Sequence, residues 1–323
     1  YAHGTGGDFH SFILPRSKVA AVLAKECIAA IGMDQLHHGT RDGGACPAPG
    51  EAGRSSCLQL LYFNFIVPIA GRDNQLQSAL DLVSMLRFAR TIDFPAAWSV
   101  YDRPTKIDPD RIMFMGHSQG GLNGPLFMAV EPEVLGGVLS GAGSTIAISL
   151  EQKVEPFDLN ELITNFAGLR DEGLDRWHPA ATLLQTFIEP GDSVNFARYW
   201  FDEPPAGHRP KSVFMTVGMT DQYTPADAGL ALAAAGRVPV INPVVQAVEA
   251  LDLLGIAAPA GVPPYSGNVA GGRASAGVAQ YENSGHFTIF EIPSATNRYG
   301  NFLRDLARFD VTDPEGSPVP GIY

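Results

Sequence analysis

Short apolar runs alternate with amphipathic stretches along most of the chain. The apolar runs have the composition of strands, which predicts strands at residues 31–38, 58–67, 112–115, 134–139, 211–218 and 277–281. In the amphipathic stretches, apolar residues recur three or four positions apart, which predicts helices at residues 17–30, 76–89, 119–130, 239–257 and 298–309 and another beginning near Pro225. Asp73 or Asn74 is expected to cap the second helix. This order of elements is typical of an α/β fold.

Residues 145–210 interrupt the alternation. Prolines recur here among aliphatic and aromatic residues, and two amphipathic stripes occur at residues 159–169 and 183–188. These helices either pack on the main sheet or form a cap over an active site, and the position of the segment in the chain favours the cap. We therefore predict a core of residues 1–144 and 211–323 with a helical cap insertion at residues 145–210.

One serine lies between a predicted strand and a predicted helix. The turn around it consists of Gly116, His117, Ser118, Gln119 and Gly120. This is the G-x-S-x-G pattern of a nucleophile elbow. Glycines two positions before and after the serine let the chain cross itself closely, and the helix directs unpaired N–H groups at negative charge beside Ser118. An ordinary Gly-rich turn is the alternative, but the flanking elements favour Ser118 as a nucleophile.

The chain opens with a second glycine-rich segment, at residues 3–7. Its sequence is His-Gly-Thr-Gly-Gly, and such a loop can bring a backbone N–H to a developing oxyanion without a side chain in the way. Thr5 is the predicted donor, with Gly4 as the near alternative, and Gln119 supplies the second N–H. A terminus without function is the other interpretation, which the serine motif downstream disfavours.

A carboxylate and a histidine follow two later strands. Asp221 lies in the turn after residues 211–218, and His286 lies in the loop after residues 277–281. The carboxyl ends of parallel strands are where such folds collect their active-site residues. A serine hydroxyl needs an imidazole to accept its proton, and a carboxylate to orient that imidazole. Asp221 could instead cap the next helix, and Asp227 is a competitor that falls inside that helix.

Charge and composition restrict the kinds of partner. The 323 residues carry a formal net charge of −12 without a basic cluster, which argues against nucleic acid as a partner. The sequence has no apolar run long enough for a transmembrane segment, and no Cys/His spacing typical of a metal site. No cofactor is expected.

Two cysteines enclose a loop rich in Gly, Pro and Ser. Cys46 and Cys57 either form a short disulfide or remain free thiols. A disulfide would indicate an extracytoplasmic or secreted protein. No signal peptide is visible before the glycine-rich segment, and the chain is expected to begin inside a strand, with its true N-terminus missing.

Taken together, these motifs resemble the α/β-hydrolase superfamily, and within it bacterial lipases and carboxylesterases. The resemblance rests on residues 3–7, the elbow at residues 116–120, Asp221 after a strand and the Gly285-His286-Phe287 segment. It implies a mostly parallel sheet of about eight strands with helices on both faces, the site at the carboxyl edge and no cofactor. In that fold the oxyanion loop follows the third strand, so the first strands are expected to be missing.

The resemblance favours a carboxylic ester hydrolase that acts on a small-molecule or lipid ester through a Ser118–His286–Asp221 triad. A peptidase or thioesterase on the same triad is one alternative. A non-catalytic binding protein on a hydrolase scaffold is another, although all three triad positions are present.

Overall fold

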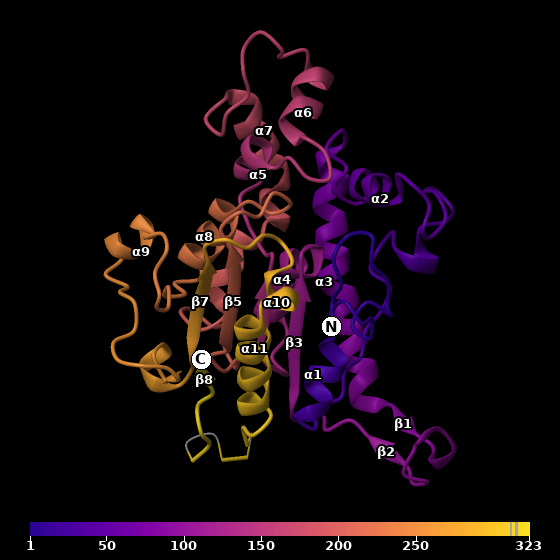
Figure 1. Ribbon diagram of the computed structural model, residues 1–323, viewed down its shortest axis with the longest axis vertical. Coiled ribbons are helices and arrows are strands. Elements are labelled where there is room, and N and C mark those ends of the chain that lie inside the picture. Colours follow the sequence, from indigo (N-terminus) through magenta and orange to yellow (C-terminus); the bar gives the residue numbers. More distant parts are fainter. Residues whose placement is uncertain (311, 314–315) are drawn as a thin grey trace.

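A four-stranded parallel sheet forms the centre of the protein (Figure 1). The computed structural model describes residues 1–310, 312–313 and 316–323. The sheet has the order β3-β4-β5-β7 and consists of β3 (Ile112–His117), β4 (Val134–Ser140), β5 (Ser212–Gly218) and β7 (Ala276–Tyr281). One row of paired residues crosses all four strands, from Gly116 through Leu139 and Met215 to Val278. The last four predicted strands are therefore confirmed.

The first residues of the chain lie parallel to β3. Ala2 forms an isolated parallel bridge with Gly116. Its N–H donates to the Met115 carbonyl at 2.9 Å, and its carbonyl accepts the His117 N–H at 3.1 Å. Within the described residues the central sheet thus has four strands and two isolated bridges, this one and one between Val240 and Val278, where the resemblance implied about eight strands. The extended start brings the glycine-rich segment directly to the end of β3.

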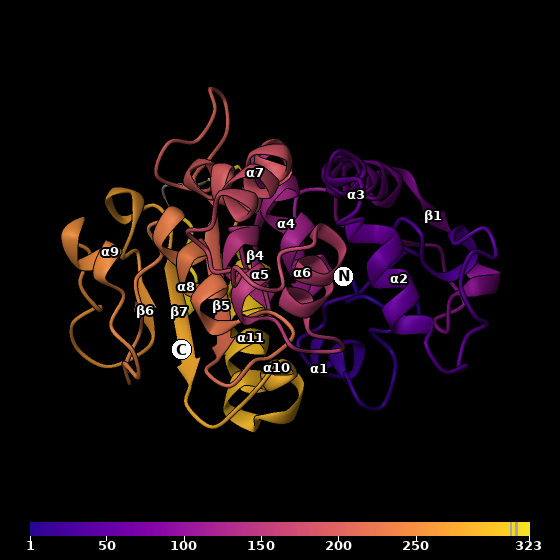
Figure 2. The same ribbon diagram turned by 90° about the horizontal axis from the view of Figure 1, so that it is seen from above.

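Helices cover both faces of the sheet (Figure 2). The helices are α1 (Val19–Lys25), α2 (Arg54–Phe63), α3 (Pro68–Thr91), α4 (Gln119–Val130), α5 (Ile146–Gln152), α6 (Leu159–Ala167), α7 (Pro179–Ile188), α8 (Ala226–Ala235), α9 (Glu249–Leu253), α10 (Thr288–Glu291) and α11 (Pro293–Leu306). Two short antiparallel pairs are formed by β1 (Asp93–Phe94) with β2 (Thr105–Lys106), and by β6 (Tyr265–Ser266) with β8 (Gly321–Ile322).

Strand β5 shows how the two faces are built. Successive side chains of a strand point to opposite faces. Met215 packs into the core on the side of α3, α4 and α8, whereas Phe214 packs on the side of α1 and α11, with its ring centroid 6.0 Å from that of Phe302. Both side chains are fully buried. A strand that is apolar on both faces is what a parallel sheet between helices requires.

A third apolar cluster joins α5, α6 and α7 above the sheet (Figure 1). Leu150, Leu159 and Ile163 are buried there, together with Phe65 from the segment after α2. These helices lie beyond the carboxyl ends of the strands, where Ile146, Leu159 and Ile188 line a cavity together with Ser118. The division into a core and a cap at residues 145–210 stays a prediction.

Residues 31–38 and 58–67 do not form the predicted strands. Residues 31–38 are irregular, and residues 58–63 belong to α2. Short apolar runs do not distinguish a strand from a buried helix. Here Leu58 and Tyr62, four positions apart, lie on the buried side of α2, and the Tyr62 hydroxyl bonds to Ser78 on α3.

Four predicted helices have other limits, among them the helix predicted at residues 298–309, which is α11. Helix α3 begins at Pro68, so neither Asp73 nor Asn74 caps it; Asn74 instead donates to the Tyr62 carbonyl at the end of α2. The predicted helix at residues 17–30 is limited to α1. Of residues 239–257 only α9 is helical, because the chain around Val240 instead pairs with β7 at Val278.

The structure contains the disulfide, which is one of the two alternatives that the sequence left open. Cys46 and Cys57 are bonded, and this bond ties the irregular segment before α2 to the helix itself. Among the helices of the described residues, none combines the length and the hydrophobicity that a membrane crossing needs.

Candidate active site

Ser118 occupies a strained turn between β3 and α4. Its φ of 56° and ψ of −121° lie outside the regions that a residue with a side chain normally adopts. The crossing is tight, since a Cβ on Gly116 would collide with the Gly120 carbonyl, and a Cβ on Gly120 would collide with the Ala2 carbonyl. The Ser118 N–H donates to the Ser140 carbonyl at 2.8 Å. The predicted elbow geometry is present.

Asp221 and His286 form a buried hydrogen-bonded pair. The Asp221 Oδ2 accepts from the His286 Nδ1 at 2.7 Å, and both side chains are less than 5% exposed. The other carboxylate oxygen of Asp221 accepts the N–H groups of Tyr223 and Thr224 at 2.8 and 2.9 Å. Asp221 therefore holds the turn that follows β5 and bonds to the imidazole. It does not cap the next helix, because α8 begins after Pro225 without a side-chain cap.

The pair lies beside the elbow at the carboxyl edge of the sheet. Ser118, Asp221 and His286 follow β3, β5 and β7, respectively. The imidazole of His286 packs over Gly141, where an added Cβ would lie 2.7 Å from its Cε1. Gly141 follows Ser140, whose carbonyl binds the Ser118 N–H. The hydrogen bonds of the described residues include the Asp221–His286 bond but none between Ser118 and His286, and such bonds are often loose without substrate.

Aromatic rings enclose His286. Tyr223 stacks on it with ring centroids 4.9 Å apart and an angle of 25° between the planes. His117 lies on another side at 4.8 Å. Burial lowers the pKa of His117 well below its ordinary value, and the nearby His286 acts in the same direction. His117 therefore stays neutral and adds no charge that would oppose protonation of His286. The sequence analysis did not identify Tyr223.

The glycine-rich segment lies against Ser118. A Cβ on Gly4 would lie 2.8 Å from the Ser118 Cβ. The Thr5 hydroxyl donates to the Gln119 Oε1 at 2.9 Å, which joins the two predicted oxyanion donors through their side chains. Among the hydrogen bonds of the described residues, neither the Thr5 N–H nor the Gln119 N–H has an acceptor. Both N–H groups are thus free for a substrate oxygen.

Gln35 connects the glycine-rich segment with the start of α4 through buried hydrogen bonds. Its Oε1 accepts from the Asn123 Nδ2 at 2.6 Å and from the Gln119 Nε2 at 3.4 Å. Its Nε2 donates to the His3 carbonyl, and its own N–H donates to the His3 Nε2 at 3.2 Å. These side chains are at most 1% exposed. Each of the three amide nitrogens here has at least one acceptor, whereas the buried Asn123 Oδ1 has no partner among the described residues. No local pattern in the sequence indicates Gln35, because its partners are distant in the chain.

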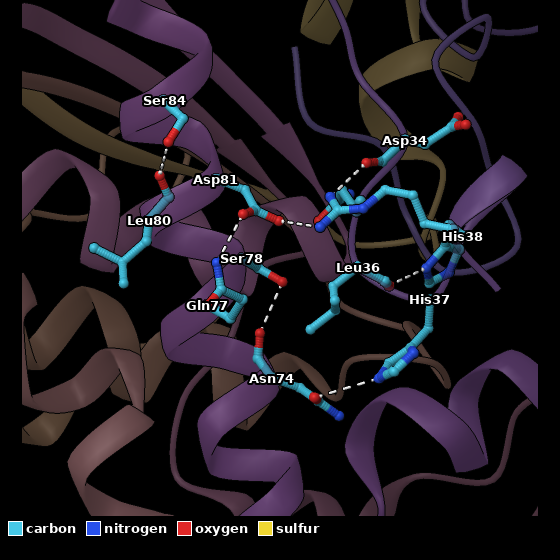
Figure 3. A network of polar contacts seen from close by, with 12 residues as sticks. Asp34, Leu36, His37, His38, Asn74, Gln77, Ser78, Leu80, Asp81 and Ser84 are labelled. Atoms are coloured by element: carbon cyan, nitrogen blue, oxygen red, sulfur yellow. Dashed lines mark hydrogen bonds and ion pairs between the residues drawn. The ribbon is translucent and has the colours of Figure 1, made fainter. Parts of the chain in front are cut away.

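The segment that carries Gln35 is anchored on α3 (Figure 3). The guanidinium of Arg41 donates to the Asp34 carbonyl at 3.0 Å and pairs with Asp81 of α3 at 2.8 Å. The His37 Nε2 lies 3.3 Å from the Asn74 Oδ1. These contacts hold the chain on both sides of Gln35, at Asp34 and at His37.

A cavity of about 100 Å³ opens in front of Ser118. Its wall includes apolar side chains from both sides of the opening, namely Phe63, Phe65, Leu122, Ile146, Leu159 and Ile188. Polar groups also contribute, among them Gln59, Gln75, Lys153 and Asp192. Within the described ranges, no three His, Cys, Asp or Glu side chains are grouped as ligands of a metal ion.

Comparison with known proteins identifies the fold. Neither a family model nor a curated protein matches this sequence. Among solved structures, the chain is similar to acetyl xylan esterase 1 of Thermoanaerobacterium sp. JW/SL YS485, at 18% identity and a TM-score of 0.53, over 94% of this chain and 73% of that chain. It is also similar to the Pyrococcus furiosus esterase Pf2001, at 14% identity and a TM-score of 0.46, over 94% of this chain and 80% of that chain. A Paleococcus ferrophilus monoacylglycerol lipase is similar at 13% identity and a TM-score of 0.44, over 95% of this chain and 92% of that chain.

The match to the acetyl xylan esterase supports one conclusion. Together with the parallel sheet and the helices on both of its faces, it shows that the chain has the α/β-hydrolase fold. This fold carries many different reactions, so the reaction has to be argued from the site itself.

Proposed function

We propose that this protein is a serine hydrolase that cleaves carboxylic esters through Ser118, His286 and Asp221. The observation that carries the proposal is the buried 2.7 Å bond between Asp221 and His286, at the sheet edge where Ser118 occupies a strained elbow. A carboxylate on Nδ1 leaves Nε2 as the unprotonated nitrogen of the neutral imidazole. That tautomer is the one that can accept a proton from a serine.

The reaction has two halves. The Ser118 oxygen attacks the ester carbonyl carbon while its proton passes to the His286 Nε2. The carbonyl oxygen becomes an anion that the N–H groups of Thr5 and Gln119 stabilise. The tetrahedral intermediate then collapses, and His286 returns the proton to the departing alkoxide, which leaves as an alcohol. Asp221 stabilises the imidazolium in between.

The second half releases the acid. Water attacks the acyl-enzyme carbonyl and gives one proton to the His286 Nε2. The second tetrahedral intermediate expels the Ser118 oxygen, which takes that proton back, and the carboxylic acid leaves. In both halves the transferred proton passes through the His286 Nε2. The apolar part of the cavity wall, which includes Phe63 and Leu122, supports an acyl chain as the group bound beside Ser118.

Hydrolysis of p-nitrophenyl esters with acyl chains of increasing length tests the proposal. We expect turnover by the wild type and a loss of at least about 10³-fold in Ser118→Ala, since removing one member of a triad abolishes most of its effect. Ser84→Ala, at an exposed serine of α3, is the matched control. Equal rates in Ser118→Ala and the wild type would remove Ser118 as the nucleophile. A folded protein without activity on any ester would refute the proposed reaction.

A further inference from the structure

A buried lysine lines the same cavity as Ser118. Lys153 is 8% exposed, and its Nζ donates to the main-chain carbonyls of Glu155 and Tyr223 at 2.6 and 2.7 Å. An ammonium group has three N–H donors, so one remains for a ligand. Among the ion pairs of the described residues, none involves Lys153.

The amine is charged at neutral pH. Burial lowers the pKa of Lys153 to about 8, while the nearby carboxylates of Asp221 and Glu155 act in the opposite direction. A buried charge is costly unless a counter-charge or further hydrogen bonds compensate for it. Two carbonyl oxygens and the Tyr223 ring, whose centroid lies 5.6 Å from the Nζ, compensate only in part, because none of them is an anion. The site therefore holds a cation that lacks a close anionic partner.

Asp192, the carboxylate in the cavity wall, is bonded differently. Its Oδ1 accepts from the N–H groups of Thr145 and Val194, both at 3.1 Å. Its Oδ2 accepts from the Thr145 N–H at 2.9 Å and from the Gln185 Nε2 at 3.0 Å. Both oxygens are thus held by the protein. Asp192 fastens the segment after β4 to the end of α7, whereas Lys153 keeps a donor for a ligand.

We propose that Lys153 binds a carboxylate on the acyl part of the substrate, so that the protein favours half esters of short dicarboxylic acids. This inference rests on the proposed ester hydrolysis. The Tyr223 carbonyl accepts from the ammonium, and the Tyr223 N–H donates to Asp221. Tyr223 thus contacts both the cation and the carboxylate of the Asp221–His286 pair. Ser118 and Lys153 line the same cavity, which suits a short acyl chain between them, and the apolar part of its wall suits the methylene groups between the two carboxyl carbons.

A purely structural role for Lys153 predicts something different. The N–H groups of Val154 and Glu155 donate to the Gln222 carbonyl, at 3.2 and 3.1 Å. The Lys153 ammonium adds its bond to the Tyr223 carbonyl, so the side chain also helps to connect this segment with the turn after β5. Loss of this structural contact would slow the hydrolysis of all substrates to the same extent. Loss of a carboxylate partner would impair only the substrates that carry a carboxylate.

The test compares two esters of the same shape, monomethyl glutarate and methyl 5-methylhexanoate, by titration of the released acid. We expect the wild type to have the higher kcat/KM on the half ester, and Lys153→Met to lower the ratio of the two values by at least about tenfold, as for a lost charge-assisted hydrogen bond. Lys211→Met is the matched control, because Lys211 is also buried but precedes β5 at the opposite edge of the sheet. Its ratio should equal that of the wild type.

An unchanged ratio in Lys153→Met, or a wild type that prefers the neutral ester, would overturn the inference. Calorimetric titration of Ser118→Ala with monomethyl glutarate separates binding from turnover. We expect binding that weakens at least about tenfold when Lys153→Met is added. Such binding by a protein whose wild type hydrolyses no ester, the p-nitrophenyl esters included, would keep the anion site and refute the proposed function. Absence of binding in Ser118→Ala would refute the anion site.

Discussion

Replacing Gln35 tests whether the predicted oxyanion donors depend on the amide behind them. Gln35→Met keeps the length of the side chain but removes all of its polar atoms. The His3 carbonyl then loses a donor, although it still accepts the Gly120 N–H at 3.1 Å. The Asn123 and Gln119 amides lose their shared acceptor in a fully buried site.

The size of the effect follows from these contacts. Each hydrogen bond contributes about 1 kcal/mol net, and a buried group left without a partner costs about 1–3 kcal/mol. The Gln35 amide has short hydrogen bonds with His3 and Asn123 and a long one with Gln119, so their loss should lower the free energy of unfolding by about 2–4 kcal/mol. The effect on catalysis has a different cause from the effect on stability. Without Gln35, the Gln119 side chain loses its hydrogen-bond acceptor and no longer holds the Thr5 hydroxyl in place. Removing one oxyanion donor costs about 10²–10³ in kcat, and a displaced donor costs less. We expect kcat to fall about 10- to 100-fold.

The assay measures kcat and KM on one p-nitrophenyl ester, together with urea unfolding. Gln35 is a positioning residue in this account, so kcat should fall while KM changes by less than about twofold. Gln77→Met is the matched control, since Gln77 is an exposed glutamine of α3 that bonds to Asp81 (Figure 3). A Gln35→Met protein with lowered stability but wild-type kcat would refute the reasoning.

Three further predictions concern pH, the disulfide and the loop beside Ser118. Burial lowers the pKa of His38 from 6.5 to about 4, so its contribution to stability is full above pH 6.5 and is lost as the pH falls toward 4. Between pH 7.5 and 5 this titration lowers the free energy of unfolding by about 2 kcal/mol. In His38→Asn, the free energy of unfolding measured with urea should therefore fall by about 2 kcal/mol less over this pH range than in the wild type; an equal fall in both proteins would contradict this. Replacing Cys46 and Cys57 by alanine should lower the free energy of unfolding by about 3 kcal/mol, whereas an unchanged urea midpoint would show that the bond adds nothing. Gly4→Ala should lower kcat/KM about 100-fold, because its Cβ would lie 2.8 Å from that of Ser118 and would displace one of the two. Wild-type kinetics would contradict this contact between the loop and Ser118.

The sequence predicted those parts of the site that local patterns determine. Ser118 is recognisable because strand, glycine spacing and helix all occur within a few residues. Asp221 and His286 could be predicted because each follows a buried strand, and parallel strands bring their carboxyl ends to one edge of the sheet. Gln35 has no such pattern. Its role comes from contacts with His3, Gln119 and Asn123, which only the folded chain brings together.

The errors in the fold have a similar origin. Residues 58–67 are apolar enough for a strand, and only the packing of Leu58 and Tyr62 on α3 decides for a helix. The chain around Val240 was predicted to be helical, but it pairs with β7, a tertiary contact that overrides local preference. Local periodicity cannot indicate which neighbour a segment will have.

The most direct test of the account is the site and rate of phosphorylation by diethyl p-nitrophenyl phosphate. Attack by a serine oxygen forms a phosphate ester on that serine and releases p-nitrophenolate. Intact mass and peptide mapping should show one diethylphosphoryl group per chain, located on Ser118, and the rate should fall at least about 100-fold in His286→Gln. Modification of another residue, or equal rates in the wild type and His286→Gln, would contradict Ser118 as a nucleophile activated by His286.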